Sequence, residues 1–172
     1  MSDRFFLNLS DVDEGTHRVT HAPHRDWRYV GLVALGGACG SAARYLVGAW
    51  ATAPLNAVPA GTIAVPVLFL FPVSTFVVNV LGAFALGYLL EALSRQGRET
   101  VRRRKIRLGI GTGVLGGFTT YSALALEVQR LLVEAPVGIA VLYVVLTLAG
   151  GTAACLGGIG VAARAARRRG AR

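Results

Sequence analysis

The chain has 172 residues, of which 53% are hydrophobic, and its formal net charge is +9. Two long stretches, Tyr45 to Leu90 and Ala135 to Ala163, contain no charged side chain. A membrane-spanning helix needs roughly 20 apolar residues, and an ordinary soluble domain does not hide uncharged stretches this long. The composition therefore excludes a soluble globular protein and predicts an all-α integral membrane protein.

Residues 1–28 differ from the remainder of the chain because they mix both charges and contain no apolar block. The segment lacks the apolar core and small-residue cleavage site of a signal peptide, so we expect a flexible tail. His17, His21 and His24 lie in this tail, and their loose spacing is not typical of a metal site.

The apolar sequence that follows predicts four membrane-spanning helices in a single domain, residues 29–163. Four prolines punctuate residues 54–72, which we interpret as a connection after the first span. A basic loop at 94–107 separates the second and third spans, and a basic tail at 164–172 closes the chain. The expected spans are 29–53, 73–93, 108–133 and 136–163.

Basic residues are distributed very unevenly between the two sides of this arrangement. All of them except Arg44 and Arg130 lie in the first tail, in the 94–107 loop, or at the end of the chain, which four spans place on one side. Lys and Arg accumulate on the cytoplasmic side, so both termini of this plasma-membrane protein are expected in the cytoplasm. Because these basic segments flank membrane spans, we expect them to bind anionic membrane lipids rather than nucleic acid.

The centre of the third expected span contains Gly116, Gly117, Thr119 and Thr120, which are poor helix formers. Irregular backbone at membrane depth is tolerated only where protein or a cavity satisfies it. Freed carbonyl groups can coordinate a hard cation, and the N-termini of half-helices favour anions. The pattern predicts a third helix broken at its centre beside an ion site, with a plain kink between packed helices as the alternative.

Polar side chains within the apolar spans are further candidate site residues, because each is costly unless it is paired or solvated. Arg44 either extends to the outer interface or draws an anion into a vestibule. Asn79 either bonds a neighbouring helix or offers N–H donors to a dehydrated anion. Each interpretation agrees with the position of these residues in the sequence.

Further polar side chains occur in the third and fourth spans. Tyr143 and Thr147 lie four residues apart and therefore share a helix face. Their hydroxyls either form interhelical hydrogen bonds or present a row of donors along the helix. Ser122 and Glu127 follow the expected break. Glu127 is either solvated at the membrane interface or paired with Arg130, three residues further on.

Cys39 and Cys155 both fall within apolar spans, where cysteine usually behaves as a small apolar residue. We therefore expect no disulfide and no cysteine-bound metal. The sequence contains no recognisable set of nucleophile and base and no phosphate-binding loop, so it does not indicate an enzyme.

Three motifs occur in order along the expected spans: "GGACGSAARY" at 36–45, "STFVVNVLGAFALG" at 74–87 and "GVLGGFTTYSALALE" at 113–127. Together they resemble the motifs of the CrcB/Fluc fluoride channels, with Ser74 where that family has glycine. The resemblance covers about residues 29–163.

The resemblance implies a small antiparallel dimer with two fluoride pores and a central structural sodium ion. It implies that backbone carbonyls of Gly116 and Thr119, with the same pair from the partner, hold the sodium. The pore, vestibule and structural residues that it implies are Asn79, Ser122, Tyr143, Thr147, Arg44 and Glu127.

The sequence departs from the family at the two positions of its pore phenylalanines, which are Tyr121 and Leu124 here. Tyr121 keeps a ring edge with partial positive charge but adds a hydroxyl, whereas Leu124 has no such edge. The one-sided distribution of basic residues also disfavours insertion in both directions. We therefore hypothesise that the chain pairs with an oppositely oriented paralogue rather than with a second copy of itself, leaving one good and one impaired pore.

Together these features predict a fluoride-selective channel subunit that lets cytoplasmic fluoride leave passively and so reduces fluoride toxicity. Two alternatives stay open. Leu124 favours a non-conducting structural subunit of such a channel. A small multidrug antiporter also has four helices in an antiparallel dimer, but that class carries an embedded acid in its first helix, where this chain has Arg44.

Overall fold

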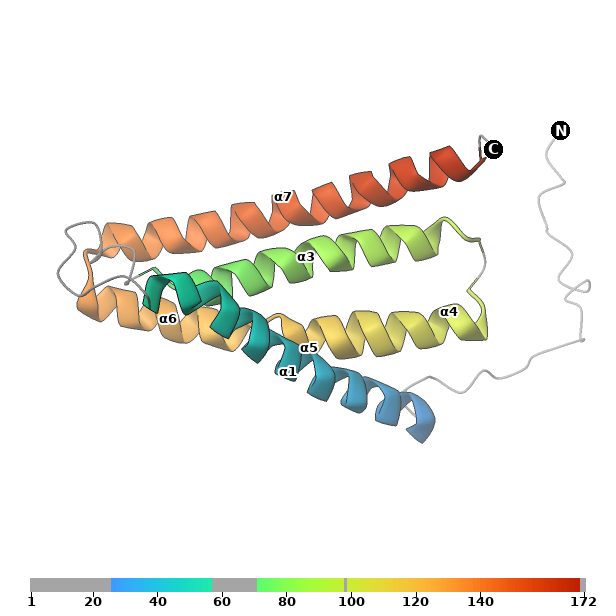
Figure 1. Ribbon diagram of the computed structural model, residues 1–172, viewed down its shortest axis with the longest axis horizontal. Helices are drawn as coiled ribbons and strands as arrows, with labels where there is room; N and C mark the ends of the chain where they lie inside the picture. Colours follow the sequence, from blue (N-terminus) through green and yellow to red (C-terminus); the bar gives the residue numbers. More distant parts are fainter. Residues whose placement is uncertain (1–25, 57–70, 98, 171–172) are drawn as a thin grey trace, which may run out of the picture.

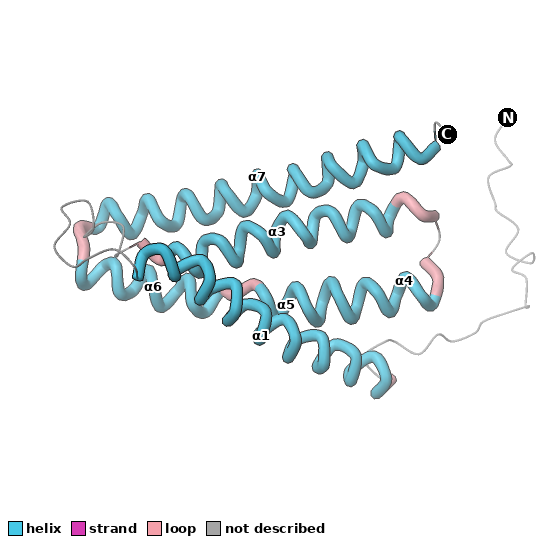
Figure 2. The backbone as a smooth tube through the Cα atoms, viewed as in Figure 1, coloured by secondary structure: helices cyan, strands magenta, loops and turns pink. Residues whose placement is uncertain are grey.

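The computed structural model describes residues 26–56, 71–97 and 99–170, which are helical apart from short turns (Figures 1 and 2). Almost all of the expected N-terminal tail, with its three histidines, and most of the 54–72 connection lie outside the described residues. The described elements are α1 (Trp27–Asn56), α3 (Val73–Ser94), α4 (Val101–Ile106), the π-helix η3 (Arg107–Leu115), α5 (Gly116–Phe118), α6 (Tyr121–Glu134) and α7 (Val137–Gly170).

Three helices, α1, α3 and α7, are long and apolar enough to cross a membrane. Most of their side chains are only partly buried within the chain, because apolar residues cover all sides of each helix rather than one stripe. These helices agree with the first, second and fourth expected spans, and the chain is a multi-pass membrane protein.

Two helices extend beyond the ends expected from the sequence. Helix α1 includes Pro54 and continues to Asn56, and α7 continues to Gly170. Most of the segment expected as a separate basic tail, 164–172, is therefore the last part of α7. Its alanines and arginines are good helix formers, which favours continuation of the helix into a polar environment.

The elements between α3 and α7 form a row in which α4, η3, α5 and α6 follow one another along the molecule (Figure 1). This row and α1 run in one direction, while α3 and α7 lie side by side and run in the other. The row is helical except between Phe118 and Tyr121, where Figure 2 shows a short non-helical segment.

Helix α1 crosses η3 and α5 at very short range because glycines meet at the crossing. A Cβ atom added at Gly36 would lie 3.1 Å from the Gly113 Cα, and one added at Gly117 would lie 2.9 Å from the Gly37 Cα. At Gly40 an added methyl group would overlap the Val114 carbonyl oxygen. We call this contact the glycine seam; it follows the general use of small residues where membrane helices pack closely.

The side-chain core of the chain is small and lies between α6 and α7. Leu131, Ala140 and Tyr143 are fully buried there. Phe71 contributes an edge-to-face contact with the Tyr143 ring, with ring centroids 5.1 Å apart. Such aromatic contacts add to the burial of apolar area, so the core fixes α7 against α6 beside the interruption.

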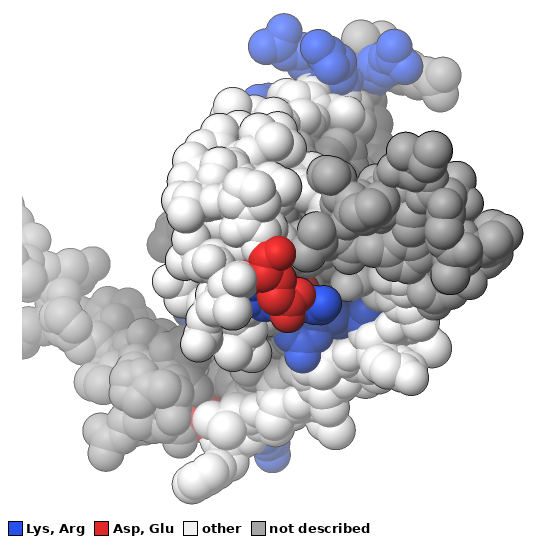
Figure 3. Space-filling view, turned by 90° about the vertical axis from the view of Figure 1, so that its left-hand side faces the viewer, with Lys and Arg blue, Asp and Glu red and all other residues white. Residues whose placement is uncertain are grey.

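The turn between α3 and α4 concentrates charge at one end of the molecule. Glu99 pairs with Arg107 at 2.8 Å and with Arg104 at 3.2 Å. The hydrogen bond from Arg107, with a smaller contribution from that of Arg104, lowers the pKa of Glu99 below its usual value. The opposite end, shown in Figure 3, is mostly uncharged over its described surface.

Candidate functional site

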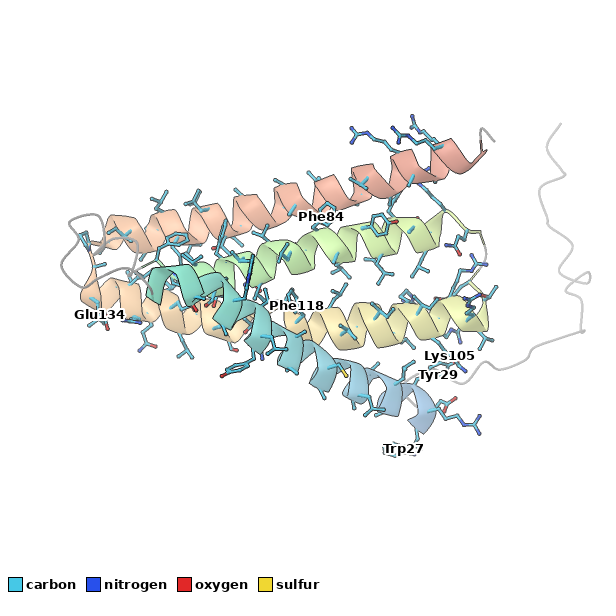
Figure 4. All side chains as sticks on the ribbon, in the orientation of Figure 1. Trp27, Tyr29, Phe84, Lys105, Phe118 and Glu134 are labelled. Carbon is cyan, nitrogen blue, oxygen red and sulfur yellow. The ribbon has the colours of Figure 1, made fainter. Side chains whose placement is uncertain are left out.

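The interruption between α5 and α6 consists of two threonines with extended backbone. Thr119 has φ −77° and ψ 157°, and Thr120 has φ −147° and ψ 127°. Phe118, labelled in Figure 4, ends α5 on the preceding side. On the following side the Ala123 N–H donates to the Thr120 hydroxyl at 3.2 Å, so Thr120 caps the start of α6.

Asn79 of α3 binds the backbone of this interruption through both ends of its amide. The Thr120 N–H donates to Asn79 Oδ1 at 2.8 Å, and Asn79 Nδ2 donates to the Thr120 carbonyl at 3.0 Å. A side-chain amide has two N–H donors, so a second one remains beyond this pair. The interhelical bond expected as one interpretation of Asn79 is therefore present, and it leaves a donor for a further ligand.

These bonds remove the usual helical donors from two carbonyl groups. In an uninterrupted α-helix the N–H of residue 120 would bond the carbonyl of 116, and the N–H of 123 would bond the carbonyl of 119. Here the Thr120 N–H goes to Asn79 and the Ala123 N–H goes to the Thr120 hydroxyl. Neither the Gly116 nor the Thr119 carbonyl accepts another hydrogen bond from the described residues.

Two freed carbonyl oxygens are the type of donor that a hard cation binds. Gly116 is exposed on this chain, and a Cβ atom added there would meet open space within 4 Å. Within residues 26–56, 71–97 and 99–170 no cluster of His, Cys, Asp or Glu could hold a metal ion. Backbone oxygens at the interruption are thus the described groups best suited to a cation.

Glu127 of α6 is held between α3 and α7 by two hydroxyl donors. Thr75 donates to one carboxylate oxygen at 2.5 Å, and Tyr143 donates to the other at 2.6 Å. Arg130, one of the two possibilities considered for Glu127, instead pairs with Glu134 at 2.8 Å. Glu134 lies four residues after Arg130 on the exposed face of α6, whereas Glu127 faces the two neighbouring helices.

A cavity of about 350 Å³ lies beside the interruption, between α3, α6 and α7. Four of the expected pore residues, Asn79, Tyr121, Leu124 and Thr147, line it. The Thr147 hydroxyl is buried and has no hydrogen-bond partner among the described residues. We call this space the Asn79 cavity. Besides the Asn79 amide and the unpartnered Thr147 hydroxyl, its lining includes the hydroxyl-bearing residues Thr119, Thr120, Tyr121 and Thr152, while Leu124 adds apolar surface.

A second cavity of about 500 Å³ opens between α1, α3 and α6, and we call it the Arg44 cavity. Arg44, Thr75 and Ser122 line it, together with Thr120, which also borders the Asn79 cavity. The Ser122 hydroxyl lies 3.2 Å from the Thr120 hydroxyl. The structure therefore places Ser122 with Arg44 rather than in the same cavity as Asn79.

The remaining expected site residues occupy different positions. Tyr143 is fully buried and commits its hydroxyl to Glu127 rather than to either cavity. Tyr121 is 82% exposed on this chain although it borders the Asn79 cavity. The Thr119 hydroxyl donates back to the Leu115 carbonyl at 3.0 Å, so its proton is already engaged by the preceding helical turn.

Sequence reasoning missed Thr75 and undervalued Thr120. Thr75 is nearly buried and binds Glu127, and it lies four residues before Asn79 on the same face of α3. This spacing of four residues from Asn79 is the sequence signal that could have identified Thr75. The sequence identifies Thr120 only as a poor helix former, whereas in the structure its N–H, its carbonyl and its hydroxyl all form hydrogen bonds at the site. Those bonds depend on contacts between helices, which spacing does not show.

Comparison with known proteins supplies an independent result. The sequence model described as "CrcB-like protein, Camphor Resistance (CrcB)" matches residues 31–159. The chain is 44% identical over 155 residues to a protein named fluoride-specific ion channel FluC 2 from Leifsonia xyli, covering 90% of this chain and 97% of that protein.

Proteins named fluoride-specific ion channel FluC from two other bacteria are also similar. The relative from Agrobacterium fabrum is 36% identical over 130 residues, covering 76% of this chain and 92% of that protein. The relative from Thermus thermophilus is 44% identical over 116 residues, covering 67% of this chain and 78% of that protein. The region matched by the family, residues 31–159, contains both cavities and the interruption.

Proposed function

The chain belongs to the CrcB family, and we propose that it is a fluoride-selective channel subunit through which cytoplasmic fluoride leaves the cell passively. Its relatives are named as fluoride-specific ion channels. Passive efflux lowers internal fluoride without an energy source or a chemical reaction, and would protect the cell against fluoride.

We assign the Asn79 cavity to fluoride, and one observation carries this assignment. An oriented amide and a buried, unpartnered Thr147 hydroxyl line the same small space. Fluoride is compact and strongly hydrated, so a dry pore has to replace its water with donors. A buried donor that lacks a partner costs free energy, and an anion that accepts from it recovers that cost.

The walls of the Asn79 cavity include Tyr121 and Leu124, the two positions at which the sequence departs from the family's pore phenylalanines. Tyr121 can present a ring edge to an anion, whereas Leu124 contributes only aliphatic surface. We propose that the chain supplies one impaired pore wall and that a paralogous subunit supplies the aromatic surface of the better pore. A second copy of the chain is the alternative partner.

The Arg44 cavity serves as the vestibule in this proposal. Its arginine attracts anions, and the Ser122 hydroxyl, which lines the same cavity, lies 3.2 Å from the hydroxyl of Thr120, a residue that also borders the Asn79 cavity. Glu127 does not face the ion path; it orders Thr75 and Tyr143 around the pore. Tyr143 therefore acts on the pore by holding α7, and hence Thr147, in place.

A structural sodium ion fits the interruption. The Gly116 and Thr119 carbonyls lack their helical donors, and oxygen atoms are the ligands that hard cations prefer. A single chain offers too few such ligands for a full shell, so the same pair from a second subunit would complete it. Bound there, the ion would neutralise the dipoles of the freed carbonyls.

The membrane arrangement follows from the direction of the elements. We propose that the row α4–η3–α5–α6 crosses the plasma membrane as a third, broken span, so that the chain crosses four times. The basic end then faces the cytoplasm with both termini and contacts anionic lipid headgroups there. An oppositely oriented partner places the two interruptions against each other, which gives an antiparallel dimer.

The structural-subunit alternative rests on Leu124, whose side chain packs against the Leu131–Tyr143 core as well as lining the cavity. The antiporter alternative has less support, because α1 contains no acidic residue. A non-conducting role predicts that the chain stabilises its partner without changing ion flow.

Fluoride efflux from loaded liposomes, followed with a fluoride-selective electrode, tests the proposal. Vesicles that contain the chain and its paralogue should release fluoride rapidly and retain chloride, and Thr147→Val in the chain should slow that release. Thr112→Val is the matched control, because Thr112 is exposed on η3 and lines neither the Asn79 cavity nor the Arg44 cavity. Absence of release with both subunits present would overturn the channel function, and rapid release by the chain alone would overturn the need for a paralogue.

A further inference from the structure

Asn79 has a second role beyond the pore, because its amide is bonded to the backbone of the interruption. We propose that Asn79 is a positioning residue for the cation site: it holds the Gly116 and Thr119 carbonyls free by binding Thr120. This inference rests on the proposed sodium site and goes beyond it by assigning an α3 side chain to the control of that site.

The first step is competition for the Thr120 N–H. That group can bond either the Gly116 carbonyl, as in a continuous helix, or Asn79 Oδ1, as observed at 2.8 Å. Without an acceptor at position 79, the bond of a continuous helix, from the Thr120 N–H to the Gly116 carbonyl, becomes available to this donor. Its formation would remove Gly116 as a cation ligand.

The second step concerns Thr119 and the cap of α6. The Thr120 hydroxyl holds the Ala123 N–H at 3.2 Å and so prevents it from bonding the Thr119 carbonyl. Asn79 Nδ2 fixes the Thr120 carbonyl at 3.0 Å, which keeps Thr120 extended with φ −147°. One amide therefore sets the backbone geometry that frees both carbonyls.

The third step links the cation to the anion path. The Asn79 amide cannot rotate while both ends bond Thr120, so its remaining N–H has a fixed direction beside the Asn79 cavity. A cation coordinated by the Gly116 carbonyl oxygen favours the state in which the Thr120 N–H bonds Asn79 rather than that carbonyl. Sodium binding and amide orientation consequently stabilise each other through Thr120.

Substitutions at Asn79 can separate positioning from conduction. Asn79→Leu removes the acceptor for the Thr120 N–H, whereas Asn79→Asp keeps a carboxyl oxygen in that place but changes the group that faces fluoride. We expect Asn79→Leu to raise the sodium concentration for half-maximal thermal stabilisation about 10-fold or more, as is usual when a residue that orients metal ligands is lost. Asn79→Asp keeps the acceptor for the Thr120 N–H but loses the Nδ2 donor to the Thr120 carbonyl, so it should weaken the sodium stabilisation less than Asn79→Leu does and should lose fluoride efflux.

A less disruptive pair of variants, at Thr120, provides the test if Asn79→Leu does not fold. Thr120→Ala releases the Ala123 N–H and should weaken sodium stabilisation, whereas Thr120→Ser keeps the hydroxyl and should retain it. Thr100→Ala is the matched control, because Thr100 caps α4 in the same way, with Arg103 N–H at 3.3 Å, far from the interruption in sequence. It should lower the melting temperature equally in sodium and potassium.

The measurement is the melting temperature of the purified assembly across a sodium series, with potassium replacing sodium at constant ionic strength. Sodium stabilisation that is unchanged in Asn79→Leu, or in Thr120→Ala if the first variant does not fold, would overturn the inference. A loss of stabilisation in Asn79→Asp as large as in Asn79→Leu would overturn the role assigned to the acceptor oxygen. A wild-type assembly without sodium stabilisation would remove the sodium site and this inference together, while the efflux assay would still decide the channel function.

Discussion

Two polar side chains near the interruption, those of Asn79 and Glu127, form hydrogen bonds that link different helical elements. Glu127 receives two hydroxyl hydrogen bonds, one from α3 and one from α7, and Asn79 bonds Thr120 twice. In an apolar environment a polar atom without a partner is costly, so these pairs hold the helices in one arrangement. The Thr147 hydroxyl is the contrasting case, because it is buried and unpartnered among the described residues.

Glu127→Ala should destabilise the folded protein by about 2–4 kcal/mol, because it leaves the Thr75 and Tyr143 hydroxyls without their acceptor. Chemical unfolding in detergent, monitored by tryptophan fluorescence, measures this loss. Glu134→Ala removes an exposed ion pair from the same helix and should cost about 1 kcal/mol or less. Equal losses in the two variants would show that the Glu127 hydrogen bonds contribute nothing specific.

Leu124→Phe should increase fluoride efflux through assemblies that contain the chain, because a ring edge carries partial positive charge toward the Asn79 cavity. The larger side chain also crowds the Leu131–Tyr143 core, and overpacking costs about 1–3 kcal/mol. Efflux should therefore be normalised to the folded fraction. Leu132→Phe, at a half-exposed position on the same helix, is the control and should leave efflux unchanged.

Among the helices, the close contact of α1 with η3 and α5 depends on the absence of side chains. Gly36 and Gly40 face Gly113 and Val114 across the glycine seam, and the Ser41 hydroxyl donates to the Gly117 carbonyl at 3.4 Å. Helices in lipid gain no hydrophobic free energy from association, so tight van der Waals contact is a main source of stability. The seam therefore sets the position of α5, and with it the start of the interruption.

Gly40→Ala should disrupt the packing of α1 against η3 and α5, and with it the assembled protein. The new methyl group would overlap the Val114 carbonyl oxygen and lie 2.9 Å from the Phe118 nitrogen. Both neighbours are backbone atoms and cannot rotate away. Gly31→Ala on the same helix has no heavy atom within 4 Å and should be neutral or stabilising by up to about 1 kcal/mol. Size-exclusion profiles and melting temperatures of the two variants measure the difference; a Gly40→Ala protein that behaves like Gly31→Ala would contradict the seam.

Over the full length of the protein, charge is segregated along the long axis. The start of α1, the α3–α4 turn and the end of α7 lie toward one end of the molecule (Figure 1), where Figure 4 labels Lys105. Arg28 belongs to the first turn of α1, and Arg167 to the last part of α7. The opposite end carries the Arg130–Glu134 pair and little other charge over its described surface (Figure 3). Such segregation favours a single direction of membrane insertion.

Cysteine labelling should show this single direction. In a variant without Cys39 and Cys155, Pro136→Cys lies in the α6–α7 turn and Gln96→Cys in the α3–α4 turn. A membrane-impermeant thiol reagent added to intact cells should label Pro136→Cys alone, and permeabilisation should expose Gln96→Cys as well. Labelling of both variants in intact cells would indicate insertion in both directions and favour a dimer of identical chains.

Composition and ordered motifs were enough to establish the membrane class, the three long apolar helices and the family, because each of these depends on local properties of the chain. Hydropathy alone locates a helix such as α3, whose uncharged sequence has no stable alternative in lipid. The low helix propensity of the glycines and threonines at 116–120 is likewise a local property of each residue, and the described backbone is extended at Thr119 and Thr120.

Which polar groups meet became clear only from the packing of the helices. Glu127 bonds Thr75 and Tyr143 rather than Arg130, and Ser122 lies in the Arg44 cavity rather than with Asn79. The packing also showed that Asn79 and the Thr120 hydroxyl divert the donors of the Gly116 and Thr119 carbonyls. The physical reason is that most of these bonds join residues far apart in sequence, so they depend on the rotation and spacing of packed helices, which no local pattern of residues specifies.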